Sequence, residues 1–328
     1  MSSAAVCFGN TILYWDAILT ALAVLAGFFA VAALYTGAKG RFSTLCLLLP
    51  LAVLLAFALS RLMYWYCHQE QFAGLGAAFQ DLSVGGYCLS GIVGGCVLAV
   101  GLLRLTGCVK DAALLLDCSA PGLSLALAVL HLSFLFNNTC RGKALIRNPR
   151  FQRLPFAAPS VTVSGTVEYR FAAFFVEALL FFLVFVVLLW LYTVYYSRAR
   201  KKRTRRGDLF LLFLLFYSGI ELVLDSTRND ASFFHFNAFI SVAQILSGVL
   251  ILTVLILFSV RSVRRYGLRP VHFLSWLLLL VGLAGVGIFE YLVQRHGDRQ
   301  LAYYSLMSLS SLVAVGAVLI VRQKLKSK

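Results

Sequence analysis

Apolar residues fill long stretches of this chain, and polar residues are confined to short segments between them. Each stretch holds about 20 residues, the length that a helix needs to cross the hydrocarbon core of a bilayer. Membrane-spanning helices are therefore predicted at residues 12–35, 43–66, 87–105, 112–136, 171–195, 209–224, 237–258, 273–293 and 303–321. The expected fold class is all-α, a polytopic membrane helical bundle.

The composition agrees with this pattern and narrows the expected partners. Hydrophobic residues make up 61% of the 328 positions and the mean hydropathy is +0.88, which excludes a soluble globular domain. The formal net charge of +16 comes mainly from Lys and Arg in short loops. Because short basic loops stay in the cytoplasm, we expect the N-terminus outside and the C-terminus inside. These charges would face anionic lipid, so we predict membrane lipid as a partner and no nucleic acid.

The eight cysteines carry no CxxC spacing, and most of them lie within apolar stretches. This pattern indicates neither a disulfide framework nor a zinc site. We predict no metal and no other cofactor. Cys140 stands apart from the other cysteines because it falls in an outer connection.

The longest outer connection, residues 137–170, contains three prolines, and five basic residues lie between positions 141 and 153. We expect it to form a small outer loop domain. Two interpretations stay open, a solvated loop and a surface that gathers anionic headgroups. The whole chain is expected to divide into a seven-span core at 1–260 and, at 261–328, two additional transmembrane helices with a basic cytoplasmic tail.

Ionisable residues inside the apolar stretches lie almost entirely toward the outer side of the membrane. A charge alone in hydrocarbon is costly, so such residues usually pair, line a wet cavity or take part in chemistry. We expect a mixed-charge pocket in the outer leaflet; a static ion-pair network and snorkelling are the alternatives. For Asp117 and Glu290 snorkelling is the preferred interpretation. The outer set comprises Asp16, Arg61, His131, Glu177, Glu221, Asp225 and Arg228.

Glu221, Asp225 and Arg228 follow the spacing i, i+4, i+7 and are predicted to share one helix face. Two carboxylates one turn apart repel each other, so this face needs a cation. Arg228 can serve Asp225 from three residues away. Glu221 would need Arg61 or a protonated His131 from a neighbouring helix, or else a proton of its own.

The third predicted span is rich in glycine, and Gly91 and Gly95 have the spacing GxxxG. In a membrane helix this spacing is typical of close packing between two backbones. Approach of a lipid headgroup to the glycine backbone is the alternative, but packing alone explains the pattern.

The order of these segments resembles the prolipoprotein diacylglyceryl transferase family. The resemblance covers roughly residues 12–258, the first seven predicted spans. Segments with family-like motifs are Leu-Tyr-Trp at 13–15, Ser-Arg-Leu at 60–62, the glycines within 90–95, residues 131–142, Val-Glu-Ala-Leu-Leu at 176–180, and residues 217–228.

Several positions of the family pattern are kept and several are changed. The kept positions are Arg61, Asn137, Gly142, Glu177, Arg228 and, as a carboxylate only, Asp225. The changed positions carry Asp16, Leu89, His131, Phe134, Thr139 and Glu221. His131 and Glu221 replace arginines, which removes positive charge. A histidine can restore that charge when protonated, or act as a base when neutral.

The resemblance implies transfer of the diacylglyceryl group of phosphatidylglycerol to the lipobox cysteine of prolipoprotein signal peptides, on the outer side of the bacterial cytoplasmic membrane. Catalytic roles are implied for His131, Glu177 and Asp225, with His131 acting on the thiol or the phosphate and the carboxylates orienting arginines. Arginine grips phosphate through its planar fork, and Asn137 would bind glycerol hydroxyls. The substrate-binding set is Arg61, Asn137, Gly142, Arg228, Glu221, Gly91 and Gly94.

Two functions of other classes stay open. The first is a membrane protein on the same scaffold that binds phospholipid or lipoprotein and has lost the chemistry. The second is a small transporter with ion-coupled carboxylates, for which the charges should lie near the membrane midplane. Their predicted outer depth argues against the transporter.

Overall fold

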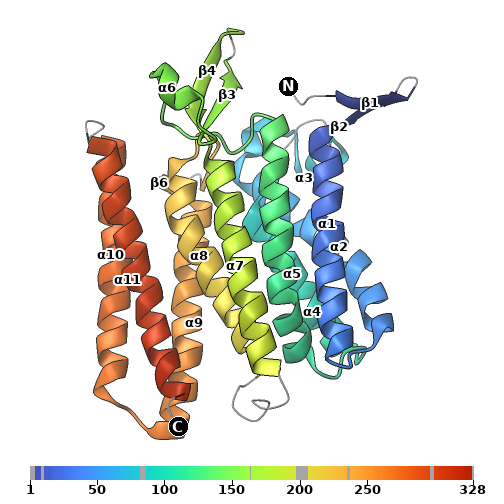
Figure 1. Ribbon diagram of the computed structural model, residues 1–328, viewed down its shortest axis with the longest axis vertical. Coiled ribbons are helices and arrows are strands. Elements are labelled where there is room, and N and C mark those ends of the chain that lie inside the picture. Colours follow the sequence, from blue (N-terminus) through green and yellow to red (C-terminus); the bar gives the residue numbers. More distant parts are fainter. Residues whose placement is uncertain are drawn as a thin grey trace. The chain divides into compact units, whose positions relative to one another are not determined.

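Long helices dominate the computed structural model, which describes residues 4–8, 11–81, 86–162, 164–196, 206–234, 237–295 and 299–326 (Figure 1). Within these ranges eight helices are long and apolar enough to cross a membrane. The helix predicted at 87–105 is the exception, because it spans 17 residues, Leu89–Leu105. The expected class, an all-α polytopic membrane protein, is confirmed. The orientation with the N-terminus outside stays a prediction.

The long helices are α1 (Trp15–Gly37), α2 (Phe42–Cys67), α4 (Leu89–Leu105), α5 (Ala112–Ser133), α7 (Ala173–Tyr196), α8 (Asp208–Thr227), α9 (Val242–Tyr266), α10 (Pro270–Arg295) and α11 (Gln300–Lys326). Short helices are η1 (Gln69–Gln71), α3 (Leu75–Gln80), η2 (Phe134–Phe136) and α6 (Pro149–Gln152). Three antiparallel hairpins pair β1 (Ala4–Phe8) with β2 (Thr11–Tyr14), β3 (Ala157–Val161) with β4 (Val167–Phe171), and β5 (Phe233–Phe234) with β6 (Asn237–Ser241).

Three predicted spans begin too early, at residues 12, 171 and 237. In each case the first apolar residues belong to a strand, and the helix starts after it at Trp15, Ala173 or Val242. An apolar run has no period that separates a strand end from a helix start. For α9 a capping box marks the start, because Ser241 and Gln244 exchange hydrogen bonds between side chain and backbone.

The chain forms two units. Unit 1 comprises Met1–Ala38, Asp117–Lys201 and Thr227–Asp230, and therefore holds α1, α7, most of α5 and the hairpin β3–β4. Unit 2 comprises Lys39–Leu116, Lys202–Ser226 and Ala231–Lys328, with α2, α4 and α8 to α11. The division predicted at residue 260 stays a prediction.

In unit 1 small residues let helices α1 and α5 approach closely. A Cβ atom placed on Gly27 would lie 2.8 Å from the Cβ of Ala126, and one on Gly122 would lie 2.4 Å from a methyl carbon of Val31. The Tyr192 hydroxyl of α7 donates to the carbonyl of Leu34 at 2.7 Å. These contacts join the three helices that carry the unit.

In unit 2 the GxxxG pair, Gly91 and Gly95, packs closely against a neighbouring helix. A Cβ on Gly91 would lie 2.4 Å from the Cα of Ser60, and one on Gly95 would lie 2.4 Å from the amide nitrogen of Ala56. Helix α4 therefore packs its glycine face against the backbone of α2, which confirms the packing interpretation. The neighbouring Gly94 is exposed, and the nearest atom to a Cβ placed on it would be Cδ1 of Leu59, 4.0 Å away.

This geometry predicts a large difference between two adjacent glycines. We expect Gly95→Ala to lower the free energy of unfolding by about 1–3 kcal/mol, because its methyl group would overlap the α2 backbone. Gly94→Ala, one residue away, should be neutral or slightly stabilising, since its nearest neighbour is 4.0 Å away. Thermal unfolding in detergent compares the two, and equal melting temperatures would contradict the packing.

Candidate functional site

The segment after α5 is held to the start of α7 and the end of α8 by backbone hydrogen bonds within unit 1. The amide of Gly142 donates to the carbonyl of Phe171 at 2.7 Å, and the amide of Lys143 donates to Thr227 at 2.7 Å. Gly142 also forms an isolated antiparallel bridge with Arg228. A Cβ at Gly142 would lie 2.8 Å from that of Phe171, so a side chain there would separate the two segments.

His131 and Glu177 form a fully buried pair across helices α5 and α7. The His131 Nε2 atom lies 3.0 Å from Glu177 Oε2, and both side chains are 0% exposed. The other ring nitrogen, Nδ1, lies 2.8 Å from the carbonyl oxygen of Leu127. A carbonyl only accepts, so Nδ1 carries a proton. Nε2 faces the carboxyl group of Glu177, so a proton on this nitrogen would make the contact an ion pair.

Aromatic rings enclose this pair. The His131 ring stacks on Phe181 with centroids 5.3 Å apart and meets Phe134 edge to face at 5.5 Å. Phe134 in turn packs on a buried cluster formed by Cys140, Ala158, Ala172 and Phe174. The low dielectric of such an environment strengthens the attraction between the imidazole and the carboxylate.

Asn137 organises the turn that follows η2. Its side-chain oxygen accepts from the amide of Thr139 at 2.9 Å, and its side-chain nitrogen donates to Asp16 Oδ2 at 3.4 Å. Its backbone carbonyl accepts from the guanidinium of Arg141 at 2.8 Å. Asn137 and Asp16 are thereby brought to the same end of unit 1.

Arg141 is a notable residue that the sequence pattern presents only as part of a basic loop. It is 4% exposed, and its guanidinium carbon lies 4.7 Å from the ring centre of Phe174. Its Nη2 donates to the carbonyls of Leu135 and Asn137, whereas Nε and Nη1 have no hydrogen-bond partner among the described residues. Burial lowers the pKa of this guanidinium. In the sequence, Arg141 could have been singled out because it directly precedes Gly142, the glycine that matches the family pattern.

The predicted helix face of Glu221, Asp225 and Arg228 is wrong for its third member. Helix α8 ends at Thr227, so Arg228 lies beyond it. Arg228 pairs with Asp230, with Nε to Oδ1 at 3.1 Å and Nη2 to Oδ2 at 3.3 Å. The helix stops because the next residues bridge to the segment around Gly142.

Asp230 links this arginine to the loop of the family-like motif. Its Oδ2 accepts from the backbone amide of Cys140 at 2.9 Å. Partial desolvation acts to raise its pKa, but the Arg228 charge and the hydrogen bonds outweigh it and hold the pKa of Asp230 below its usual value. Arg228 and Asp230 also lie within electrostatic reach of Glu177.

The structure therefore brings five of the predicted site residues together in unit 1. They are His131, Asn137, Gly142, Glu177 and Arg228. The other five, Arg61, Gly91, Gly94, Glu221 and Asp225, belong to unit 2. Within unit 2, Glu221 and Asp225 are both buried on α8 one turn apart, as predicted.

Arg61 is fully buried and holds the segment after α2. Its Nε, Nη1 and Nη2 atoms donate to the carbonyls of Ala78, Gly86 and Asp81 at 2.7, 2.9 and 2.7 Å. The rings of Tyr64, Phe72 and Tyr87 lie within 6.0 Å of its guanidinium carbon. The fork that would grip a phosphate is thus directed at backbone carbonyls. Its phosphate role stays a prediction.

The snorkelling interpretation of Asp117 and Glu290 is wrong. Both are 2% exposed and bonded inside the protein. Asp117 Oδ2 accepts from the Tyr196 hydroxyl at 2.8 Å. Glu290 accepts from the side-chain amides of Gln244 at 3.0 Å and Gln294 at 2.8 Å. Because both carboxyl groups find polar partners inside the protein, neither side chain has to extend to water.

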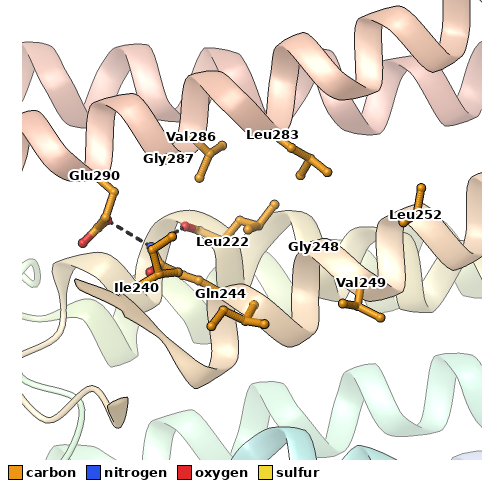
Figure 2. A pocket seen from close by; sticks show the side chains of 11 residues that line it. Leu222, Ile240, Gln244, Gly248, Val249, Leu252, Leu283, Val286, Gly287 and Glu290 are labelled. Carbon is orange, nitrogen blue, oxygen red and sulfur yellow. Dashed lines mark hydrogen bonds between the residues drawn. The ribbon is translucent and has the colours of Figure 1, made fainter. Parts of the chain in front are cut away.

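Glu290 and Gln244 also mark one end of a pocket in unit 2. Figure 2 shows these two side chains joined by a hydrogen bond, with Leu252 and Leu283 toward the other end. The pocket has a volume of about 320 Å³ and is lined by residues of α8, α9 and α10 and by Ile240. Among the described residues, no group of three or more His, Cys, Asp or Glu is placed to hold a metal ion.

Comparisons with known proteins match this chain to one family. The family model described as prolipoprotein diacylglyceryl transferase matches residues 3–260. The chain is also similar to the phosphatidylglycerol–prolipoprotein diacylglyceryl transferase of Bacillus licheniformis, with 27% identity over 231 residues. That alignment covers 66% of this chain and 77% of the relative.

The ion pair of Arg228 and Asp230 lies beyond the end of α8 and predicts that the stability of the fold depends on pH. Because the folded pKa lies below the unfolded value of about 3.9, ionised Asp230 stabilises the fold above that value, and this contribution is lost as the pH falls through the folded pKa. Asp230→Asn should therefore lower the melting temperature at neutral pH, with a difference that shrinks as the pH falls below the unfolded pKa of about 3.9. In an Arg228→Met background the difference should be smaller throughout. A difference that is the same at every pH would contradict the pairing.

The contacts of Arg61 predict that its guanidinium group stabilises the fold, and that another positively charged side chain could not replace it. Arg61→Lys keeps the charge but cannot reach three carbonyls at once, so we expect a loss of roughly 2 kcal/mol. Arg264→Lys, at an exposed position of α9, is the matched control and should change nothing. Thermal unfolding without any lipid substrate measures both. Unchanged stability of the Arg61 variant would favour phosphate binding as the role of this arginine.

Proposed function

Since the chain belongs to the prolipoprotein diacylglyceryl transferase family, we propose that it transfers the diacylglyceryl group of phosphatidylglycerol to the lipobox cysteine of prolipoproteins. We place the reaction at the outer leaflet of the bacterial cytoplasmic membrane. The observation that carries the proposal is the buried His131–Glu177 pair, which stands next to the segment of the family-like motif.

The pair supports a division of labour between its two members. Both ring nitrogens of His131 are engaged, one by Leu127 and one by Glu177. His131 therefore acts as a positioning residue, and a proton on its Nε2 atom stabilises Oε2 of Glu177. Oε2 lies 3.0 Å from His131, and we assign the other oxygen, Oε1, as the proton acceptor in this scheme.

The reaction then follows from simple chemistry. The cysteine thiol gives its proton to Glu177 while its sulfur attacks the glyceryl carbon bonded to the phosphate oxygen. A C–S bond forms, the C–O bond breaks, and glycerol phosphate leaves with the electron pair. The proton passes from Glu177 to that phosphate. No redox step is needed, and no cofactor enters the scheme.

The leaving phosphate requires positive charge, and unit 1 offers it on both sides of Gly142. Arg228 bridges to Gly142, and Arg141 precedes it in the chain. The Nε and Nη1 atoms of Arg141 lack acceptors within the described ranges, and an oxyanion would supply them. We assign phosphate contact to these two arginines. Asn137 keeps its proposed role at the glycerol hydroxyls.

A second candidate is a non-catalytic member that binds phospholipid or lipoprotein. It is favoured by the loss of family arginines at His131 and Glu221, and by the commitment of Arg61 to backbone carbonyls. Both candidate functions require lipid binding, but only the first predicts that the protein forms the diacylglyceryl thioether.

Turnover is measured with purified protein in phosphatidylglycerol liposomes and a synthetic lipobox peptide, with mass spectrometry of the diacylglyceryl thioether. We expect product, and a loss of at least about 100-fold in Glu177→Gln, because the general base is removed. Glu168→Gln makes the same chemical change on the β4 strand and should retain full activity. If the unaltered protein yields no thioether where an active family enzyme does, the non-catalytic candidate stands.

A further inference from the structure

The pocket of Figure 2 is built in part by a helix outside the family match. The match ends at residue 260, whereas α10 begins at Pro270 and supplies Leu283 and Glu290 to the pocket. The proposed transfer reaction uses none of these residues. The pocket is therefore a feature of this chain that the proposed function leaves unexplained.

Two glycines form opposite walls of the pocket. Gly248 of α9 and Gly287 of α10 both line it, and a Cβ added to either one would meet no atom within 4 Å. The volume of about 320 Å³ would hold on the order of ten water molecules. Most lining residues are apolar, and apolar cavities stay dry or take apolar ligands. In a pocket between membrane-spanning helices, the available apolar ligand is a hydrocarbon chain.

The polar end of the pocket presents the carboxyl oxygens of Glu290. Both oxygens accept from side-chain amides, those of Gln244 and Gln294. Among the described residues that line the pocket, none is Lys or Arg. Each carboxylate oxygen has a further lone pair, so this end favours a ligand that donates hydrogen bonds and disfavours an anion.

The same polar end is tied to helix α8. Gln244 donates both to Glu290 and to the carbonyl of Leu222, the residue after the buried Glu221. The pocket therefore lies beside the part of α8 that resembles the family motif at 217–228.

We propose that this pocket binds one acyl chain of the diacylglyceryl group after its transfer to cysteine. This inference rests on the proposed function. The product has no phosphate, and its glyceryl group sits next to peptide N–H donors, which complement Glu290. Phosphatidylglycerol carries an anionic phosphate at the same distance from its chains, and the carboxylate repels it. The pocket thus discriminates product from substrate by charge.

Two probes with a diazirine in one acyl chain test the proposal, one a synthetic S-diacylglyceryl-cysteine peptide amide and the other phosphatidylglycerol. Each is photolysed with the protein in nanodiscs, and labelled residues are mapped by mass spectrometry. We expect the product probe to label Val249, Leu252 and Leu283 at least five times more than the phosphatidylglycerol probe. Glu290→Gln should reduce that preference to less than twofold.

Two further variants test the proposal by filling the pocket with a leucine side chain. Gly248→Leu and Gly287→Leu should each reduce labelling by the product probe at least fivefold, whereas Gly101→Leu, at an equally open position of α4, should leave it unchanged. Equal labelling by the two probes in the unaltered protein would overturn the proposal, and so would labelling that persists in both filled variants. Because the product probe is added ready-made, pocket labelling without any turnover would refute the transfer reaction and leave the binding site intact.

Discussion

Hydrocarbon offers no hydrogen bonds, so every polar side chain between the membrane-spanning helices must find its partners inside the protein. The pair of His131 and Glu177 is the clearest case, because neither side chain reaches solvent. The same constraint explains the bond between Asp117 and Tyr196 and the two amides around Glu290. Polar groups thus act as fixed points that set which helices are neighbours within each unit.

The helices could be predicted because their signal is strong. Stretches of about 20 apolar residues are typical of membrane-spanning helices and rare in soluble domains. The glycine spacing around Gly91 predicted close packing against another helix, which the structure identifies as α2. The helix starts could not be predicted where a short strand precedes the helix. The end of α8 was missed for a related reason, since the i, i+7 position of Arg228 assumes a helix that in fact stops at Thr227.

The candidate site shows a sharper limit. The sequence could single out His131, Glu177 and Arg61 as unusual, since charges in apolar runs need a reason. It could not say which of them bind one another, because partners come from distant segments. Arg61 turned out to face three carbonyls, and Arg228 found Asp230, which lies outside every predicted span. Arg141 was hidden among other basic residues, although burial distinguishes it from them.

The side chain of Gln244 forms hydrogen bonds to residues at the start of α9, in α8 and in α10. Its oxygen accepts from the backbone amide of Ser241 at the start of α9, while its nitrogen donates to Leu222 of α8 and to Glu290 of α10. A shift of α9 by one residue would turn this side chain by about 100° and break all of these bonds together. The amide therefore sets the rotational register of α9, and an insertion or deletion in the first turn of this helix would break its bonds to α8 and α10 together.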